Sequence, residues 1–249
     1  MYTVNGSPYF RLDSLLSESD AKTLDEEISW GLTLAEEVSP SEGSEFSRGD
    51  ADLSLYDHRF KDCEFAKNEL TPDEREKFRT LSFLKRSRYL KFGKKAYFPW
   101  GTSYSLIDKS SWVAKMETHD KVFTEEAKRL FPKLIDWAQS LPVFKGIGRI
   151  SILGVDACQH ATCHRDTDPS FWKSKDQLLM LSPRGDKLFY IFDEVKKEKI
   201  FTNSKLFTFD DLAYHGVDPS PYFTYSVRID GPFTEEYDRK ISYDRVKQS

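Results

Sequence analysis

The chain of 249 residues is poor in cysteine and histidine. It contains three cysteines, Cys63, Cys158 and Cys163, and only five histidines. Three cysteines without zinc-like spacing favour neither a disulfide framework nor a structural zinc site, and they predict a reduced, cytoplasmic protein. A chain of this length also buries roughly three quarters of its unfolded surface, so the core needs no cross-link.

Long hydrophobic runs and a dominant charge are lacking as well. The longest uninterrupted apolar run is Leu188–Phe192, whereas a membrane-spanning helix needs about 20 residues. The residues after Met1 are polar and turn-forming, so we expect no secretory signal. The 37 Lys and Arg residues nearly balance the 41 Asp and Glu residues. We therefore expect neither a membrane nor a nucleic acid as a partner.

The first 95 residues or so have a mainly helical pattern. Helices are indicated by apolar residues that recur every four positions, by a threonine–proline–acid start, and by a proline that divides a longer stretch. In this part the predicted helices are 17–38 and a helix that runs from 71 toward 90. Beyond it, a further helical stretch is predicted at 124–141 and is split near Phe131.

After Pro142 the sequence changes to short strands separated by turn residues. The predicted strands are Arg149–Val155, Gln177–Leu181, Lys187–Phe192, Lys199–Thr202, Lys205–Phe209 and Tyr222–Asp230. Many short strands within about 100 residues predict an antiparallel barrel or jelly roll with helices outside. We expect one α+β domain over 1–249, with helical support in 1–95 and the jelly-roll core in 96–249. The polar segment 39–55 is predicted to be a connecting loop.

The strand-rich part contains a candidate metal site. His164 and Asp166 stand two residues apart, and on an extended backbone such residues project from the same face. His215 could add a third ligand from a facing strand. Two histidines and one carboxylate form the facial triad of non-haem iron(II) oxygenases. A zinc hydrolase could use the same ligands, and in a third interpretation the histidine and the aspartate merely satisfy one another.

A buried cation is predicted on the last strand. In Tyr222–Asp230 apolar and polar residues alternate, so one face is apolar and the other includes Thr224, Ser226 and Arg228. If the polar face points into the barrel, the arginine needs an anion, because an unpaired buried charge costs several kcal/mol. Its planar fork suits a carboxylate.

These residues resemble the iron(II)/2-oxoglutarate-dependent dioxygenases. The resemblance rests on His164-x-Asp166, on His215 and on Arg228 thirteen residues further on. It implies a double-stranded β-helix core of the jelly-roll or cupin kind, and it implies Fe(II), 2-oxoglutarate and O₂ as cofactor and co-substrates. His164, Asp166 and His215 would bind the metal and provide the catalytic centre. Arg228 would bind the far carboxylate of 2-oxoglutarate.

One position departs from the family pattern. Many members have a serine or threonine two residues after the arginine, where it helps to bind the same carboxylate. Here that residue is Asp230, a poor partner for an anion. We expect Ser226 to take the hydroxyl role, with Thr224 as the alternative.

The resemblance implies a hydroxylase that releases succinate and CO₂. Family members that halogenate lack the carboxylate ligand, so Asp166 favours hydroxylation. The sequence pI of 5.8 and the lack of a basic stripe disfavour nucleic acid as the substrate, and we favour an amino acid or a peptide side chain. The alternatives are a non-catalytic jelly-roll module that binds a diacid and a zinc-dependent hydrolase that uses the same His/Asp/His ligands.

Overall fold

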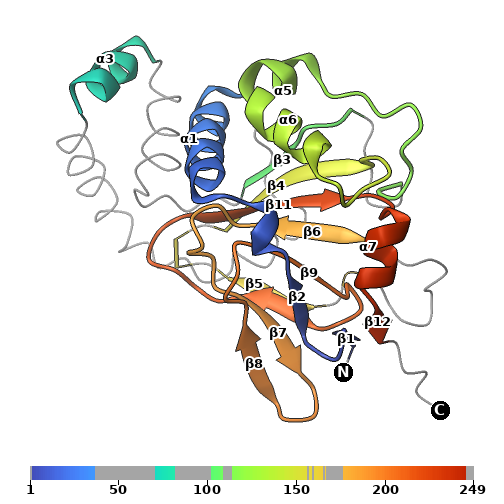
Figure 1. The fold of residues 1–249 in the computed structure, drawn as a ribbon. Coiled ribbons are helices and arrows are strands. Elements are labelled where there is room, and N and C mark those ends of the chain that lie inside the picture. The colour runs from blue at the N-terminus through green and yellow to red at the C-terminus, as the bar shows by residue number, and fades with distance from the viewer. Residues whose placement is uncertain are drawn as a thin grey trace.

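The core consists of two antiparallel β-sheets (Figure 1). The computed structural model describes residues 2–36, 71–81, 102–108, 114–155, 157–158, 160–164, 166 and 176–244. The larger sheet has the order β2-β9-β6-β11-β4-β3, and the smaller has the order β5-β10-β7-β8. A jelly-roll-like arrangement of antiparallel strands, with few helices, is thus confirmed.

The strands of the larger sheet come from distant parts of the chain. They are β2 (Tyr9–Arg11), β9 (Leu206–Phe209), β6 (Leu178–Leu181), β11 (Thr224–Asp230), β4 (Arg149–Val155) and β3 (Thr102–Ser105). The smaller sheet contains β5 (Ala161–His164), β10 (His215–Val217), β7 (Phe189–Asp193) and β8 (Glu198–Phe201). Each of the six strands predicted from the sequence is present within two residues of its expected bounds.

The predicted helix starts are confirmed, two of them by side-chain caps. In α1 (Glu18–Leu34) the Ser17 side chain accepts a hydrogen bond from the Asp20 amide. In α3 (Pro72–Thr80) Thr71 and Glu74 form a reciprocal capping box. The division near Phe131 is confirmed by α5 (Glu125–Leu130) and α6 (Pro132–Ser140), with proline in the first turn of α6.

The amino-terminal part is not only helical. β2 pairs with β9, and β1 (Thr3–Val4) pairs with β12 (Tyr243–Asp244), which follows α7 (Glu235–Lys240). Such short strands depend on their pairing partners far along the chain, so the local pattern did not predict them.

The larger sheet is buried on both faces. One face packs with α1, α5 and α6 around apolar residues such as Ile150, Val227 and Ile229. The other face shares a second apolar cluster with the smaller sheet, which includes Met180 and Phe207 from one sheet and Phe189 from the other. Because all seven residues of β11 are buried, its polar residues lie in the space between the sheets.

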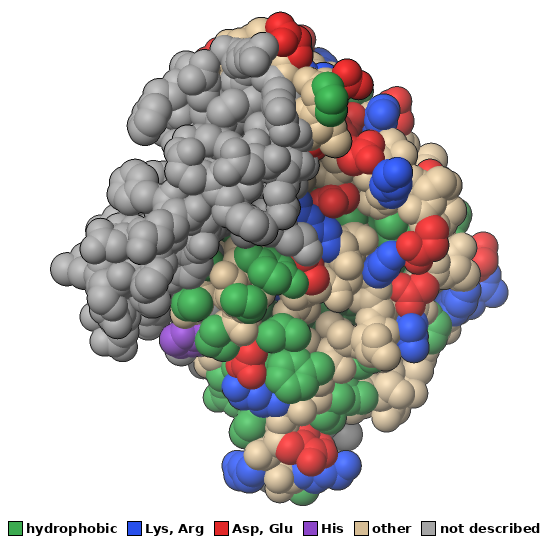
Figure 2. Space-filling model, turned by 90° about the vertical axis from the view of Figure 1, so that its left-hand side faces the viewer, with side chains coloured by type: hydrophobic (Ala, Val, Ile, Leu, Met, Phe, Trp, Pro, Cys, Tyr) green, Lys and Arg blue, Asp and Glu red, His purple; other side chains and the backbone are tan. Residues whose placement is uncertain are grey.

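The described surface is mixed in charge. Lys and Arg side chains alternate with Asp and Glu side chains over the described part of the face in Figure 2. Large exposed apolar side chains are few in the described ranges: Val122, Leu188, Val195 and Phe201. In these same ranges no helix is long and apolar enough to cross a membrane.

Helix α1 is tied to the sheet by a polar cluster around Asp25. Its Oδ1 accepts hydrogen bonds of 2.6 Å from Tyr225 Oη and of 2.6 Å from Arg184 Nε. The Arg184 guanidinium also lies 5.0 Å from the centre of the Tyr225 ring. Arg184 is in the turn between β6 and β7, so this cluster fixes that turn against both α1 and β11.

We expect Asp25→Ala to lower the free energy of unfolding by about 2 kcal/mol, because it leaves the buried Tyr225 hydroxyl and the Arg184 guanidinium without this acceptor. Urea unfolding would measure the change. Asp136→Ala, on an exposed position of α6, is the control and should change the value by less than about 0.5 kcal/mol. Equal effects of the two substitutions would contradict the structural role of Asp25.

Candidate metal centre

His215 is buried between two phenylalanine rings and fixed by a backbone hydrogen bond. It begins β10 and is 4% exposed, with Phe189 stacked on its ring at 5.6 Å and Phe209 edge-on at 4.7 Å. Its Nδ1 lies 2.9 Å from the carbonyl oxygen of Ala213. Because a carbonyl only accepts, Nδ1 donates this hydrogen bond, and the other ring nitrogen, Nε2, faces Asp166. A backbone carbonyl of this kind commonly orients a metal-binding imidazole.

Asp166 faces the second ring nitrogen of His215, Nε2. Its Oδ1 is 3.5 Å from His215 Nε2, and each of the two side chains is 6% exposed. Two ligand atoms, each about 2.1 Å from one metal and at right angles, are about 3.0 Å apart. The observed distance is close to that value, so the donor set fits a shared divalent cation after a small adjustment.

For the third predicted ligand, His164, the structure describes only the backbone. His164 ends β5 and is the register partner of His215 on β10. Its side chain lies outside the described part of the structure, and no group of three possible ligands is found among the described side chains. Asp166 follows two residues after the end of β5, so it is not on the strand as the sequence pattern predicted.

Arg228 lies between two carboxylates inside the molecule. Its Nη1 donates to Asp166 Oδ2, and its Nε lies 2.8 Å from Asp230 Oδ1. Burial by itself would lower the pKa of Arg228, but the neighbouring carboxylates of Asp230 and Asp166 raise it above its usual value. The guanidinium therefore stays charged and holds the second oxygen of the candidate ligand Asp166.

Asp230 explains the departure from the family pattern. Its second oxygen, Oδ2, lies 2.9 Å from Arg149 Nε, so this fully buried carboxylate bridges two arginines. Asp230 thus serves Arg228 and Arg149 as a counter-ion, and it is not a substitute for a carboxylate-binding hydroxyl.

A second buried cluster supports the backbone next to the candidate ligand. The carbonyl oxygen of Asp211 accepts a hydrogen bond of 3.2 Å from the amide of Asp166. Burial and the adjacent Asp176 carboxylate raise the pKa of Asp211 above its usual value. Lys115 Nζ lies 2.8 Å from Asp176 Oδ2 and 3.6 Å from Asp211 Oδ2. Nothing in the local sequence pattern predicted that these three residues meet.

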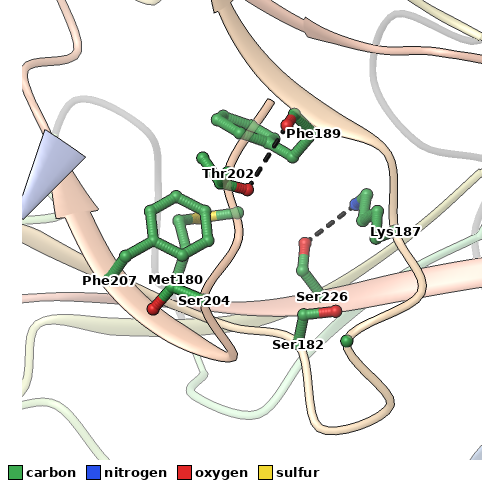
Figure 3. A pocket seen from close by; sticks show the side chains of 9 residues that line it. Met180, Ser182, Lys187, Phe189, Thr202, Ser204, Phe207 and Ser226 are labelled. Atoms are coloured by element: carbon green, nitrogen blue, oxygen red, sulfur yellow. Dashed lines mark hydrogen bonds between the residues drawn. The ribbon is translucent and has the colours of Figure 1, made fainter. Parts of the chain in front are cut away.

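Ser226, the predicted hydroxyl partner, contacts a different cation. Its Oγ lies 2.8 Å from Lys187 Nζ, which also lies 3.0 Å from the carbonyl oxygen of Leu153. Lys187 belongs to the segment between β6 and β7 and reaches across to β11 (Figure 3). Lys187 has no local signal of a functional role, because its burial arises only from the packing of the two sheets.

Lys187 and Ser226 line a small pocket between the sheets. The pocket also includes the hydroxyls of Ser182, Thr202 and Ser204, with an apolar wall of Met180, Phe189 and Phe207. Its volume is about 10 Å³, enough for about one water molecule. Phe189 stacks on His215, so the pocket and the candidate metal centre share a wall.

Burial lowers the pKa of Lys187 to about 7, although the nearby Asp186 charge acts in the opposite direction. Between about pH 7 and the usual lysine value of 10.5, the unfolded chain keeps a proton on Lys187 that the folded chain releases. The contribution of Lys187 to the free energy of unfolding therefore rises with pH across that window and is lowest below about pH 7.

We expect Lys187→Met to stabilise the ligand-free protein, by on the order of 3–5 kcal/mol at pH 6.5 and by less at pH 8.5. Urea unfolding at both pH values would measure this. Lys199→Met, on the exposed hairpin β7–β8, is the control. An equal gain at the two pH values would contradict the assignment of the titrating group.

Two predicted segments lie outside the residues that the structure describes. They are the loop 39–55 and the continuation of the helix from 82 toward 90. Thr224, the alternative to Ser226, is buried on the same strand.

Comparisons with known proteins give structural similarity only. No family model matches the chain, and no curated protein is similar to it in sequence. Among solved structures it is similar to a Pseudomonas putida prolyl-4-hydroxylase, with 9% identity, 54% of this chain and 70% of that chain covered, and a TM-score of 0.32. It is also similar to the viral collagen prolyl hydroxylase from Paramecium bursaria Chlorella virus-1, solved as a 2-oxoglutarate complex, with 10% identity, coverage of 91% and 96%, and a TM-score of 0.35.

A third similar structure is EvdMO1, with 15% identity, coverage of 51% of this chain and 34% of that chain, and a TM-score of 0.31. Because all three TM-scores are below 0.5, the assignments below rest on this chain's own residues.

Proposed function

We propose that this chain is an iron(II)- and 2-oxoglutarate-dependent dioxygenase with a double-stranded β-helix core. The observation that supports this most is the 3.5 Å distance between Asp166 Oδ1 and Nε2 of buried His215. With His164 as the third ligand, these residues would hold ferrous iron. When bound, iron would let O₂ oxidise 2-oxoglutarate and a substrate C–H bond together, with one oxygen atom going to succinate as CO₂ is released and the other to the hydroxylated product.

The buried charges favour a metal together with a dianion. Asp166 and Asp230 offset Arg228 and Arg149, so these four side chains add up to no net charge. A divalent cation beside Asp166 would add two positive charges to this interior, and burying them uncompensated would be costly. A dianionic co-substrate such as 2-oxoglutarate restores the balance.

The protein's own residues would orient and enclose the reactants. The carbonyl of Ala213 fixes the tautomer of His215, and Arg228 holds one oxygen of Asp166 so that the other can bind the metal. The inward face of β11, with Ser226 and Arg228, would receive the co-substrate. The aromatic rings around His215 exclude water from this side of the site.

The proposal is tested by adding ferrous iron and 2-oxoglutarate to the protein without oxygen. A weak visible absorption band is expected for the wild type, and its absence in His215→Ala would locate the metal. His119→Ala, at an exposed position, is the control and should keep the band. A wild-type protein that produces neither the band nor succinate under air would contradict the proposal and favour a binding module.

For the substrate we propose an amino acid or a peptide side chain. The test is succinate release across a panel of free amino acids and short peptides, compared with release without substrate. Activity on a hydrolysable substrate that persists without oxygen and ignores 2-oxoglutarate would instead support a zinc-dependent hydrolase.

A further inference from the structure

We infer that Lys115 is a positioning residue for the candidate metal centre, and that it acts through one buried turn that supports both Asp166 and His215. The metal that these two side chains would bind comes from the proposed function, on which the inference rests in that respect. The positioning itself is a property of the protein without metal and can be measured separately.

The segment Asp210–Ala213 is a turn that joins β9 of the larger sheet to β10 of the smaller sheet. The Ala213 amide donates a hydrogen bond of 2.8 Å to the carbonyl oxygen of Asp210, and the Leu212 amide donates one of 3.0 Å to the Asp210 carboxylate. Each of the four residues is at most 2% exposed. The turn is therefore held by its own hydrogen bonds and by the close packing around it.

Two carbonyl oxygens of this turn hold the two candidate ligands. The Asp211 carbonyl accepts a hydrogen bond of 3.2 Å from the Asp166 amide, and the Ala213 carbonyl accepts one of 2.9 Å from Nδ1 of His215. Asp166 lies beyond the end of β5, so the pairing of β5 with β10 does not extend to its backbone. The relative position of the two ligands therefore depends on where the turn lies.

Lys115 fixes the turn through the side chain of Asp211. Its Nζ lies 3.6 Å from Asp211 Oδ2 and 2.8 Å from Asp176 Oδ2, and both Lys115 and Asp211 are almost fully buried. Asp176 directly precedes Gln177 at the start of β6, so the ammonium ties the turn to the larger sheet. Without the ammonium, two neighbouring carboxylates would lose the cation that they share, which is unfavourable in the interior. We expect the turn to shift in response.

The backbone of Lys115 is fixed independently of its ammonium. Lys115 belongs to a turn that is closed by a 3.0 Å hydrogen bond from the Glu117 amide to the Ala114 carbonyl oxygen. This turn packs directly on Gly148, where an added Cβ atom would come within 2.1 Å of the Lys115 carbonyl oxygen. Gly148 directly precedes β4. Because only glycine allows so close an approach, Lys115 is anchored to the larger sheet at its backbone.

The positioning role is tested by hydrogen exchange in the metal-free protein, followed by NMR. We expect Lys115→Met to speed the exchange of the Asp166 amide and of the Nδ1 proton of His215 by about 10-fold or more, because the turn that accepts both hydrogen bonds opens locally. Asp25→Ala, which weakens the fold at a different place, is the matched control and should leave both sites slow. Equal acceleration in the two variants would show a general loss of stability and would overturn the inference.

Two further variants test whether the charge of Lys115 is responsible. When Lys115→Met is combined with Asp211→Asn, the carboxylate that lost its cation is also neutral, so slow exchange at Asp166 should return. Continued fast exchange in the double variant would contradict the role of the ion pair. Lys115→Arg keeps the charge but displaces it, and it should give a smaller acceleration at the same sites. It serves as the test if Lys115→Met does not fold, and unchanged exchange would then overturn the inference.

A second arm measures the metal itself. Equilibrium dialysis with ferrous iron in the absence of oxygen should give a Kd about 10- to 100-fold higher for Lys115→Met than for the wild type. Lys128→Met, at an exposed position of α5, should bind iron as the wild type does. If the wild type binds no iron but Lys115→Met still speeds exchange at Asp166, the proposed function fails and the positioning role stands. Equal iron affinity of the wild type and Lys115→Met would overturn the inference.

Discussion

Replacement of Asp166 by alanine is expected to abolish both ferrous iron binding and succinate production. Asp166 Oδ1 lies 3.5 Å from His215 Nε2, where we propose that the metal binds, while its Oδ2 accepts a hydrogen bond from Arg228. Loss of a side chain that only supports a ligand typically reduces metal affinity 10- to 100-fold. Loss of the ligand itself should exceed that range, and the loss of activity should be at least about 100-fold.

Asp166→Asn removes the negative charge of the side chain but keeps its shape. The amide keeps the size of the side chain but offers a weaker, neutral donor to the metal, so we expect strongly reduced iron binding with the fold intact. Iron binding is measured by equilibrium dialysis and by the anaerobic absorption band, and folding by circular dichroism. Asp136→Asn, on the exposed face of α6, should bind iron as the wild type does. Wild-type iron affinity in Asp166→Ala would exclude this residue as a ligand.

Replacement of Arg228 by methionine is expected to destabilise the protein by about 3–5 kcal/mol, because it leaves Asp166 and Asp230 buried without the cation they share. Urea unfolding at neutral pH would measure the loss. Arg228→Lys keeps a charge and should lose less. A loss below about 1 kcal/mol would contradict the central position of this arginine.

A double substitution tests whether Asp166 is a carboxylate whose buried charge Arg228 compensates. In Arg228→Met combined with Asp166→Asn, one of the uncompensated carboxylates is removed, so part of the stability should return. We expect a coupling free energy of about 1–3 kcal/mol between the two positions. Additive effects of the two substitutions would show that Arg228 and Asp166 do not interact in the folded protein.

The elements with strong local signals were predictable. Ser17 and the capping box of Thr71 and Glu74 mark helix starts, and Pro132 marks a division, because each acts through neighbouring backbone groups. Alternation in Tyr222–Asp230 separated the apolar face from the polar face, and β11 is buried on both faces as the barrel hypothesis required. The strands β1 and β2 lacked such signals, since their stability comes from distant partners.

The candidate site was only partly predictable. The choice of His215 and Asp166 followed from the scarcity of histidine and from the spacing of the motif, and the structure brings these two side chains within 3.5 Å. The pairing of Arg228 with Asp166 did not follow, because it joins a strand of the larger sheet to a residue beyond the end of β5. From the sequence, Asp230 is a poor neighbour for a carboxylate-binding site because it is itself an anion. Its contact with Arg149 shows that it acts as a counter-ion.

The sequence by itself determined which residues make up the proposed site: a few histidines, one suitably spaced acid, an arginine on a polar strand face and strands that alternate in polarity. Those are properties of residue type and local spacing, so they can be read along the chain. Only the tertiary structure decided which charges neutralise one another. Lys115 and Lys187 acquire their significance from burial, and burial depends on packing between segments far apart in the chain.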